Sequence, residues 1–311
     1  MSDAAARPRV HAVTINWNRA EDTLACVRSL QASRFPLERI LVLDNGSRDG
    51  SVERLERELI GPGLELRRNP ENEGYARGMN ACLRHALDAG ADLVFAVNND
   101  TVVDPDCVGL LVAALEADPR GGVAGPAILF HARPDTVWQA GGSFAYWRAG
   151  VAVPAKGRPA GELPQAPRRV SFLTGCALLF SRKALETVGL LDPAFYFYAE
   201  DVDFGLRVQQ AGLRLVFEPR ARVWHRIDDV ARERTSPFVV YHLGRSGALL
   251  FRKRFQGPYR WYGIALQYLL YTPHRLLQML RGRAPRESFA AWFEGLADGV
   301  RGREPRRRSP S

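Results

Sequence analysis

The chain has 311 residues and a formal net charge of +9, with 43 Lys and Arg against 34 Asp and Glu. This length is enough for one large α/β domain with an appendage and an ample core. The four cysteines show no paired metal-ligand spacing and fall in apolar or helix-like runs, which argues against a cysteine metal site and favours buried thiols in a reducing compartment. The first nine residues are polar and unlike a signal peptide, so we expect a cytoplasmic protein.

Strand-like and helix-like apolar patterns alternate through the first 130 residues. Such alternation is typical of strand-helix-strand units packed into a mostly parallel sheet. The patterns predict strands at 10–15, 39–43, 64–67, 93–97 and 123–130, and helices at 21–31, at 52–59, after Gly74 and from Pro105. We therefore expect a doubly wound, nucleotide-binding α/β unit over about residues 10–130.

Two turns place polar groups directly after the first two predicted strands: Asn16 with Trp17, and Asp44 with Asn45. An aromatic ring can stack on a nucleobase while an amide or carboxylate hydrogen-bonds the base edge or the ribose. The alternative is ordinary turn and helix-cap chemistry, which fits the small residues at 46–50 best. No G-x-G-x-x-G follows the first strand, which argues against a dinucleotide-binding oxidoreductase.

The apolar strand at 93–97 ends in Asn98-Asn99-Asp100. A carboxylate at the carboxyl end of a buried strand lies where open α/β sheets bind ligands. With amides beside it, such a carboxylate suits one divalent cation that bridges a diphosphate. The pattern therefore favours nucleotide-sugar chemistry, and the alternative is a simple Asn-Asp turn that closes the strand.

Residues 131–169 are rich in proline and glycine, which predicts a long excursion over the surface rather than a linker between domains. Its aromatic residues could line an acceptor groove or anchor the loop, and the sequence leaves both readings open: Trp138, Phe144, Tyr146 and Trp147.

Three acids, Glu200, Asp201 and Asp203, follow the aromatic run at 195–198. Displacement at a sugar carbon needs a base for the acceptor hydroxyl, and aromatic walls raise a carboxyl pKa toward a useful value. Mutual repulsion should make at least one of the three titrate late. The alternative is an acidic first turn that caps an amphipathic helix.

Most of the positive charge lies in the C-terminal tail. From Tyr241 onward there are fourteen Lys or Arg against four acids. The apolar, aromatic segment 261–271 is too short to span a bilayer, and its arginine flanks predict a helix lying on an anionic leaflet. Nucleic acid competes for any basic patch, but we expect no nucleic-acid partner here. The remaining alternative is a helix packed on the domain or on a second subunit.

Taken together, several segments resemble the family 2 inverting glycosyltransferases of GT-A fold, in particular the rhamnosyltransferase-like members that build bacterial surface polysaccharides. The segments that carry the resemblance lie at 13–19, 40–51, 69–80, 98–101, 199–212 and 224–226. The resemblance implies a Rossmann-like mixed sheet flanked by helices, a nucleotide-diphosphate sugar donor and a divalent cation, Mg or Mn. It also implies a single displacement that inverts the anomeric centre.

The resemblance also implies roles for individual residues. Residues matched to the donor site are Asn16, Trp17, Asp44 and Asn45 at the nucleobase and ribose, and Asn72, Gly74, Arg77 and Asn80 beside the nucleotide and sugar. Asp100 matches the last carboxylate of the family's D-x-D motif, with Asn98 where its first Asp often stands. His225 matches a histidine that reaches the metal or the diphosphate, although a lone histidine is more often structural. Asp201 matches the base and Glu200 its neighbour in acceptor positioning. The turn at 175–178 also fits, although packing would explain it equally well.

We therefore predict a glycosyltransferase domain over 1–240, with its acceptor half at about 131–240, and a basic helical extension over 241–311. The expected reaction moves a sugar such as rhamnose to a hydroxyl of a cell-surface or polyprenyl-linked glycan at the inner face of the plasma membrane. The competing functions are a nucleotidyltransferase, which should carry a Gly-rich triphosphate loop that is missing after the first strand, and a non-catalytic nucleotide or glycan binder. The sequence leaves the oligomeric state open.

Overall fold

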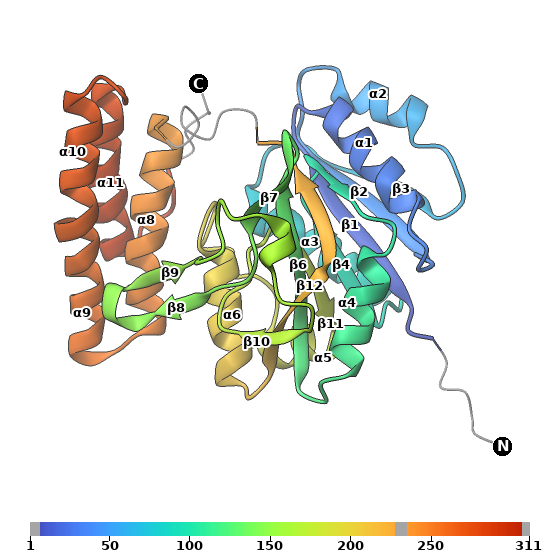
Figure 1. Cartoon of the computed structure of the whole chain (residues 1–311). Coiled ribbons are helices and arrows are strands. Elements are labelled where there is room, and N and C mark those ends of the chain that lie inside the picture. The colour runs from blue at the N-terminus through green and yellow to red at the C-terminus, as the bar shows by residue number, and fades with distance from the viewer. Residues whose placement is uncertain (1–6, 228–234, 307–311) are drawn as a thin grey trace.

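A mixed β-sheet forms the centre of the molecule, with helices packed against both of its faces (Figure 1). The computed structural model describes residues 7–227 and 235–306, and the sheet has ten strands within those ranges. The predicted α/β class is confirmed.

The N-terminal half alternates strands and helices as the apolar patterns predict. Its elements are β1 (Val10–Asn16), α1 (Ala20–Gln31), β2 (Arg39–Asn45), α2 (Ser51–Glu58), β3 (Leu64–Asn69), α3 (Tyr75–Asp88), β4 (Leu93–Val97), β5 (Thr101–Val103), α4 (Cys107–Glu116) and β6 (Gly121–Phe130). The strands β1, β2, β3 and β4 pair in parallel, so their carboxyl ends meet at one edge of the sheet.

The segment 131–169 contains short strands as well as loops. Its elements and those after it are β7 (Arg133–Gln139), β8 (Ser143–Ala145), β9 (Gly150–Ala152), β10 (Arg168–Val170), β11 (Ala177–Ser181), α5 (Arg182–Val188), α6 (Glu200–Gln210) and β12 (Arg214–His225). The strands β7 and β10 join the central sheet by pairing with β6 and β12. The sequence did not predict these two strands within the surface excursion, because short and partly exposed strands carry little apolar periodicity. The strands β8 and β9 form a separate hairpin.

The main path of the sheet runs β10-β12-β6-β11-β4-β1-β2-β3, with β5 paired to β12. The strand β11 runs antiparallel between β4 and β6, and β12 runs parallel to β6. Two apolar cores follow from this arrangement. One lies under α3, α5 and α6, and the other lies under α1 and α4.

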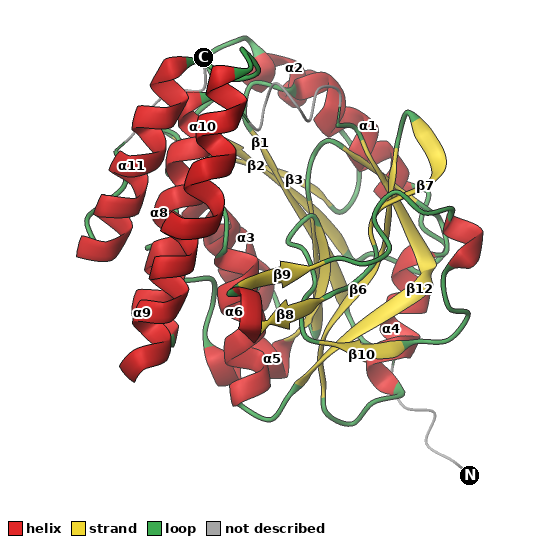
Figure 2. Cartoon of the chain, turned by 60° about the vertical axis from the view of Figure 1, so that its left-hand side comes forward, coloured by secondary structure: helices red, strands yellow, loops and turns green. Residues whose placement is uncertain are grey.

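Helices α8 (Pro237–Arg254), α9 (Gly257–Leu266), α10 (Thr272–Leu280) and α11 (Arg286–Arg301) follow the sheet domain. They stand together beside it (Figure 2), and a π-helical turn at Gln267–Tyr271 joins α9 to α10. Ser236 caps α8 by accepting a hydrogen bond from the Val239 amide, and Pro237 occupies its first turn. The predicted boundary at residue 240 falls inside α8, and the division into two domains stays a prediction. Within the described ranges, no helix combines the length and apolar character needed to cross a bilayer.

Glycines allow α8 and α11 to pack at close range. A Cβ at Gly295 would lie 2.1 Å from the carbonyl oxygen of Tyr241, and one at Gly299 would lie 2.3 Å from that of Arg245. Trp292 on the same face of α11 is buried. The two helices therefore meet backbone to backbone.

We predict that Gly295→Ala destabilises the protein by about 1–3 kcal/mol, because α11 has to move away from α8 to admit the methyl group. Denaturant unfolding measures this loss. Gly161→Ala is the matched control, since no atom lies within 4 Å of a Cβ there. Equal unfolding midpoints for the two variants would show that the close helix contact is not maintained in solution.

Candidate functional site

The predicted donor-binding residues converge at the carboxyl edge of the parallel strands. In the sheet register Asn16 lies opposite Asp44, and Asn45 lies opposite Asn69. Asn98 follows β4, the other neighbour of β1. The topology therefore brings together turns that are far apart in the sequence, as expected for the binding edge of an open sheet.

Several of these residues are buried and bonded to one another. Asn16 Nδ2 donates to Asp44 Oδ2 at 2.7 Å, and the amides of Gly46 and Ser47 donate to Asp44 Oδ1 at 3.1 and 2.9 Å. Asn45 is also buried, and its side chain bonds the segment that follows β3. Asn16, Asp44 and Asn45 thus fix the shape of the edge. The predicted donor-site side chains with exposed surface are Trp17, Asn72, Arg77 and Asn98.

The loop before α3 docks against the aromatic run at 195–198. Gly74 has a φ of 85°, and a Cβ there would lie 2.5 Å from the ring of Tyr196. The Tyr75 amide donates to the Tyr196 carbonyl oxygen at 3.1 Å. On the same helix, Asn80 bonds the backbone of Leu191 through both of its side-chain groups, at 2.7 and 2.9 Å. Asn80 therefore holds the loop that leads to the aromatic run.

Asp100 and His225 meet where β12 ends beside β5. The Nε2 atom of His225 lies 3.0 Å from Oδ1 of Asp100. Asp100 Oδ1 and His225 Nδ1 are both buried, and neither makes a hydrogen bond of good geometry among the described residues. Burial lowers the pKa of His225, but Cys176 and Asp100 outweigh it and raise the pKa above its ordinary value.

With the imidazole neutral, this pair fits two ligands of one cation, so a cation would have to displace the proton that the raised pKa favours. Neighbouring ligands of an octahedral ion with bonds of about 2.1 Å lie roughly 3 Å apart, which is the separation of the two atoms. The described residues gather no group of three or more His, Cys, Asp or Glu around a possible ion. A cation at this place would therefore depend on further ligands from outside the protein.

The start of α6 presents Glu200 and Asp201 from a strained turn. Tyr198 and Ala199 both have a φ of 67°, in the left-handed region that costs non-glycine residues on the order of 1 kcal/mol each. Asp201 Oδ2 accepts the Gly175 amide at 2.9 Å, and Oδ1 accepts the Val202 amide at 2.7 Å. Glu200 is buried, and its Oε2 has no hydrogen-bond partner in the described part of the chain.

The environments of these two carboxyl groups separate their titrations. Burial, followed by the charge of Asp201, raises the pKa of Glu200 to about 8. Burial also raises the pKa of Asp201, but its two backbone donors favour the anion. Asp201 is therefore the first of the two to lose its proton, and Glu200 keeps its proton to about pH 8. Most walls of the small cavity beside them are apolar: Met79, Ala96, Leu178, Phe180 and Leu191.

The turn at Gly175 and Cys176 joins the two parts of the site. The Cys176 carbonyl oxygen accepts the Asn98 amide at 2.8 Å, while the Gly175 amide donates to Asp201. The Tyr75 hydroxyl donates to the Gly175 carbonyl oxygen at 3.1 Å. Sequence reasoning left this turn open between acceptor approach and packing, and it did not identify Tyr75.

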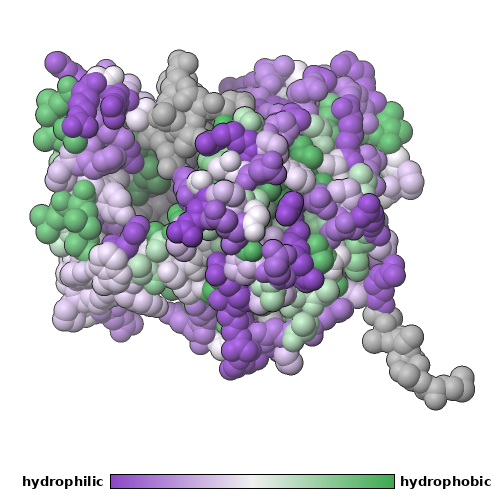
Figure 3. Space-filling view, in the orientation of Figure 1, coloured by the Kyte–Doolittle hydropathy of each residue, from purple (hydrophilic) through white to green (hydrophobic). Residues whose placement is uncertain are grey.

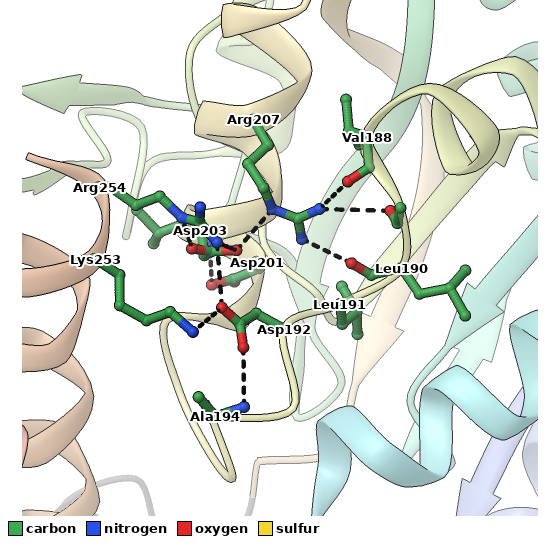
Figure 4. A network of polar contacts seen from close by, with 12 residues as sticks. Val188, Leu190, Leu191, Asp192, Ala194, Asp201, Asp203, Arg207, Lys253 and Arg254 are labelled. Atoms are coloured by element: carbon green, nitrogen blue, oxygen red, sulfur yellow. Dashed lines mark hydrogen bonds and ion pairs between the residues drawn. The ribbon is translucent and has the colours of Figure 1, made fainter. Parts of the chain in front are cut away.

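A network of ion pairs ties α6 to α8 behind the acids (Figure 4). Asp203 is fully buried and contacts Arg207 at 2.9 Å and Arg254 at 3.1 Å. Asp192 binds the same Arg254 at 3.2 Å and Lys253 at 2.5 Å. The remaining groups of Arg207 donate to backbone carbonyl oxygens between 188 and 190. Sequence reasoning missed the role of Arg254, because its partner lies 51 positions away.

The aromatic residues of the segment 131–169 lie in different environments. Phe144 stacks on Phe255 at 5.7 Å, and Tyr146 contacts the same ring edge-on at 6.3 Å, so both anchor the hairpin to the C-terminal helices. Trp138 packs edge-on against His225 at 4.8 Å. Trp147 is exposed.

Comparison with known sequences identifies the family of the chain. The sequence profile of glycosyl transferase family 2 matches residues 12–189. An N-acetylglucosaminyl-diphospho-decaprenol L-rhamnosyltransferase of Mycobacterium tuberculosis is 29% identical over 246 residues, which cover 71% of this chain and 78% of that protein. The O-antigen biosynthesis protein RfbC of Myxococcus xanthus is 27% identical over 252 residues, which cover 76% of this chain and 19% of RfbC.

Solved glycosyltransferases share the fold. GalNAc-T7 with UDP, GalNAc and Mn²⁺ superposes with a TM-score of 0.64 at 20% identity, covering 97% of this chain and 59% of that one. The mannosyltransferase PcManGT of Pyrobaculum calidifontis, in complex with GDP-Man and Mn²⁺, gives 0.58 at 18% identity, with coverage of 95% and 88%. TarS of S. aureus in complex with UDP-GlcNAc gives 0.57 at 16% identity, with coverage of 96% and 82%. The predicted GT-A fold is confirmed.

We predict that Arg254→Met lowers the free energy of unfolding by on the order of 3 kcal/mol, because it leaves the buried charges of Asp203 and Asp192 with fewer partners. Urea unfolding measures the loss. Arg28→Met is the control, since Arg28 is largely exposed in its pair with Glu58 and should contribute at most about 1 kcal/mol. Similar losses in the two variants would contradict a structural role for the network.

Proposed function

This chain belongs to glycosyl transferase family 2, and on that premise we propose an inverting transfer of a sugar, such as rhamnose, from a nucleotide-diphosphate donor to a glycan hydroxyl. Glycosyltransferase activity follows from the family, and the stereochemistry, donor and acceptor are the proposal. The observation that carries it is a carboxylate, Asp201, held by two backbone amides next to the buried Glu200, beside the ligand-binding edge of the sheet.

In the proposed step, Asp201 accepts the proton of the acceptor hydroxyl. The hydroxyl oxygen forms a bond to the anomeric carbon of the donor sugar while the bond to the nucleotide diphosphate breaks, with its electron pair leaving on the diphosphate. Asp201 forms no bond to the sugar, so the transfer is a single displacement by the acceptor oxygen. A single displacement inverts the configuration at the anomeric carbon. Two backbone amides hold its carboxylate in place, and Glu200 in its neutral form can donate a hydrogen bond that orients the acceptor.

The donor occupies the carboxyl edge of β1, β2 and β4 in this proposal. Trp17 provides a face for the base, and Arg77 and Asn72 provide polar groups for the nucleotide and sugar, since these side chains are not buried. The other matched residues shape the edge: Asn16, Asp44, Asn45, Gly74 and Asn80. Asn98 lies beside Asp100 at the diphosphate end.

Asp100 and His225 would hold the proposed divalent cation, Mg or Mn. Such an ion stabilises the negative charge that develops on a leaving diphosphate. Asn98 supplies no charge where the family often has an acid, so we expect the cation to bind weakly until the donor diphosphate adds its oxygens.

For the acceptor, we propose a polyprenyl-linked or cell-surface glycan and a peripheral contact with the inner face of the plasma membrane. The mycobacterial relative is named for a diphospho-decaprenol substrate, which supports a lipid-linked acceptor for this chain. Nucleic acid is not part of the proposal.

Asp201→Asn should lower turnover by about 10²-fold to 10⁴-fold, because the acceptor proton loses its base. Release of nucleotide diphosphate from a donor panel, with and without acceptor, measures this change. Donor affinity should stay near its original value in the same variant. Normal acceptor-dependent turnover by Asp201→Asn would remove the base assignment, and a non-catalytic binder would show no turnover before the substitution either.

The pH profile should separate the two acids. Activity should rise with pH as Asp201 loses its proton, and a second inflection near pH 8 should mark the ionisation of Glu200. Glu200→Gln mimics the protonated form of Glu200. This variant should therefore keep the rise in activity that follows the ionisation of Asp201 and should lose the inflection near pH 8. If the upper inflection persists in Glu200→Gln, it belongs to another group.

Asp100→Ala should abolish the increase in donor-nucleotide affinity that Mn²⁺ gives the unaltered protein, because the charged ligand is lost. Calorimetric titration of a nucleotide diphosphate with Mn²⁺ or with chelator measures this without any turnover. Asp106→Ala, which removes an exposed carboxylate paired with Arg34, is the control. Full activity in chelator, or metal-dependent binding by Asp100→Ala, would contradict the cation site.

A further inference from the structure

The outer face of the C-terminal helices carries large apolar side chains in solvent. Figure 3 shows hydrophobic residues gathered along the left-hand edge, over the outermost helices. Trp261, Leu269 and Leu280 are 61%, 69% and 70% exposed, and further exposed members of this face are Tyr262, Leu270, Leu276 and Leu277. Single exposed apolar residues are normal on a protein surface, but a contiguous group of them marks a site of interaction with a protein or a membrane.

A second element, far away in the sequence, extends the same surface. Trp147, at the tip of the β8–β9 hairpin, is 77% exposed. The hairpin reaches toward α9 (Figure 1), and the hydroxyls of Tyr259 and Tyr262 donate to the backbone carbonyl oxygens of Tyr146 and Trp147. We call this combined face, Trp147 with the outer side of residues 261–280, the outer surface.

Within the segment 255–286, which carries most of the outer surface, the charge has one sign. Between residues 255 and 286 there are five arginines and no Asp or Glu: Arg260, Arg275, Arg281, Arg283 and Arg286. Arg281, Arg283 and Arg286 are exposed at the end of α10 and the start of α11. Apolar and aromatic side chains rimmed by arginine match the interface of a membrane that contains anionic lipids.

A second copy of the chain fits this surface less well. In a two-fold dimer the same patch meets itself, so arginines would face arginines without a carboxylate from this segment.

We propose that the outer surface docks the protein on an anionic lipid bilayer, with Trp147 and Trp261 in the headgroup region. The ion pairs between Arg254 of α8 and Asp203 of α6 fix these helices relative to the acid turn, so docking also sets the orientation of Asp201 toward the membrane. The proposal rests on the proposed function in one respect: a lipid-linked acceptor would give the protein a reason to bind a membrane.

Flotation of the full chain with vesicles tests the docking directly. The protein should bind vesicles of phosphatidylglycerol and phosphatidylcholine, bind pure phosphatidylcholine weakly, and dissociate as salt screens the arginines. The triple variant Trp147→Ser, Trp261→Ser, Leu269→Ser should bind the anionic vesicles at least about tenfold more weakly, because it removes three of the four most exposed apolar side chains of the outer surface. Ile60→Ser is the matched control, since Ile60 is 76% exposed but belongs to no part of this surface; it should bind normally.

A second measurement identifies the inserted residues. Lipids brominated near the headgroup should quench the tryptophan fluorescence of the bound protein, and Trp147→Phe with Trp261→Phe should remove most of the quenching while binding is retained. Absence of vesicle binding, or equal binding by the triple variant, would overturn the proposal. If the triple variant instead loses self-association in light scattering, the surface is a subunit interface. None of these outcomes depends on Asp201, whose substitution by Asn should lower transfer and leave vesicle binding intact.

Discussion

The hydrogen bond from the Gly175 amide to the Asp201 carboxylate holds the two halves of the site together. One residue further on, the Cys176 carbonyl accepts the amide of Asn98, which leads to Asp100. A short stretch of backbone thus sets the position of the proposed base relative to the proposed donor edge. The same bond favours the ionised form of Asp201 inside an apolar pocket, because a backbone donor replaces part of the water that the anion has lost.

Contacts from α8 stabilise the strained turn before the acids and the buried Asp203 after them. The left-handed turn at Tyr198 and Ala199 costs energy, and the Ser246 hydroxyl of α8 donates to the Phe197 carbonyl oxygen beside it at 2.8 Å. The ion pairs of Asp203 with Arg254 hold the helix that follows. The C-terminal helices therefore act as a support for the acid turn as well as a candidate membrane contact.

The sequence predicts the parallel half of the fold well, because strands buried on both faces read as continuous apolar runs. It does not predict β7, whose exposed first half includes Pro134. Motif matching places Asn45 and Asn80 at the site but does not reveal their partners, and the structure shows both bonded to the protein backbone. The contacts of Arg254 and of Trp147 join segments far apart in the chain, so no local pattern announces them. The roles of the site residues in catalysis stay predictions.

The central claim is that one anionic carboxylate, Asp201, deprotonates the acceptor and no protein group attacks the sugar. Proton NMR of the first product, formed from a donor of known anomeric configuration, tests this claim most directly. If the acceptor oxygen attacks directly, the configuration at the anomeric carbon of the product is opposite to that of the donor. Retention of the donor configuration would require a different chemistry at the site and would contradict the account.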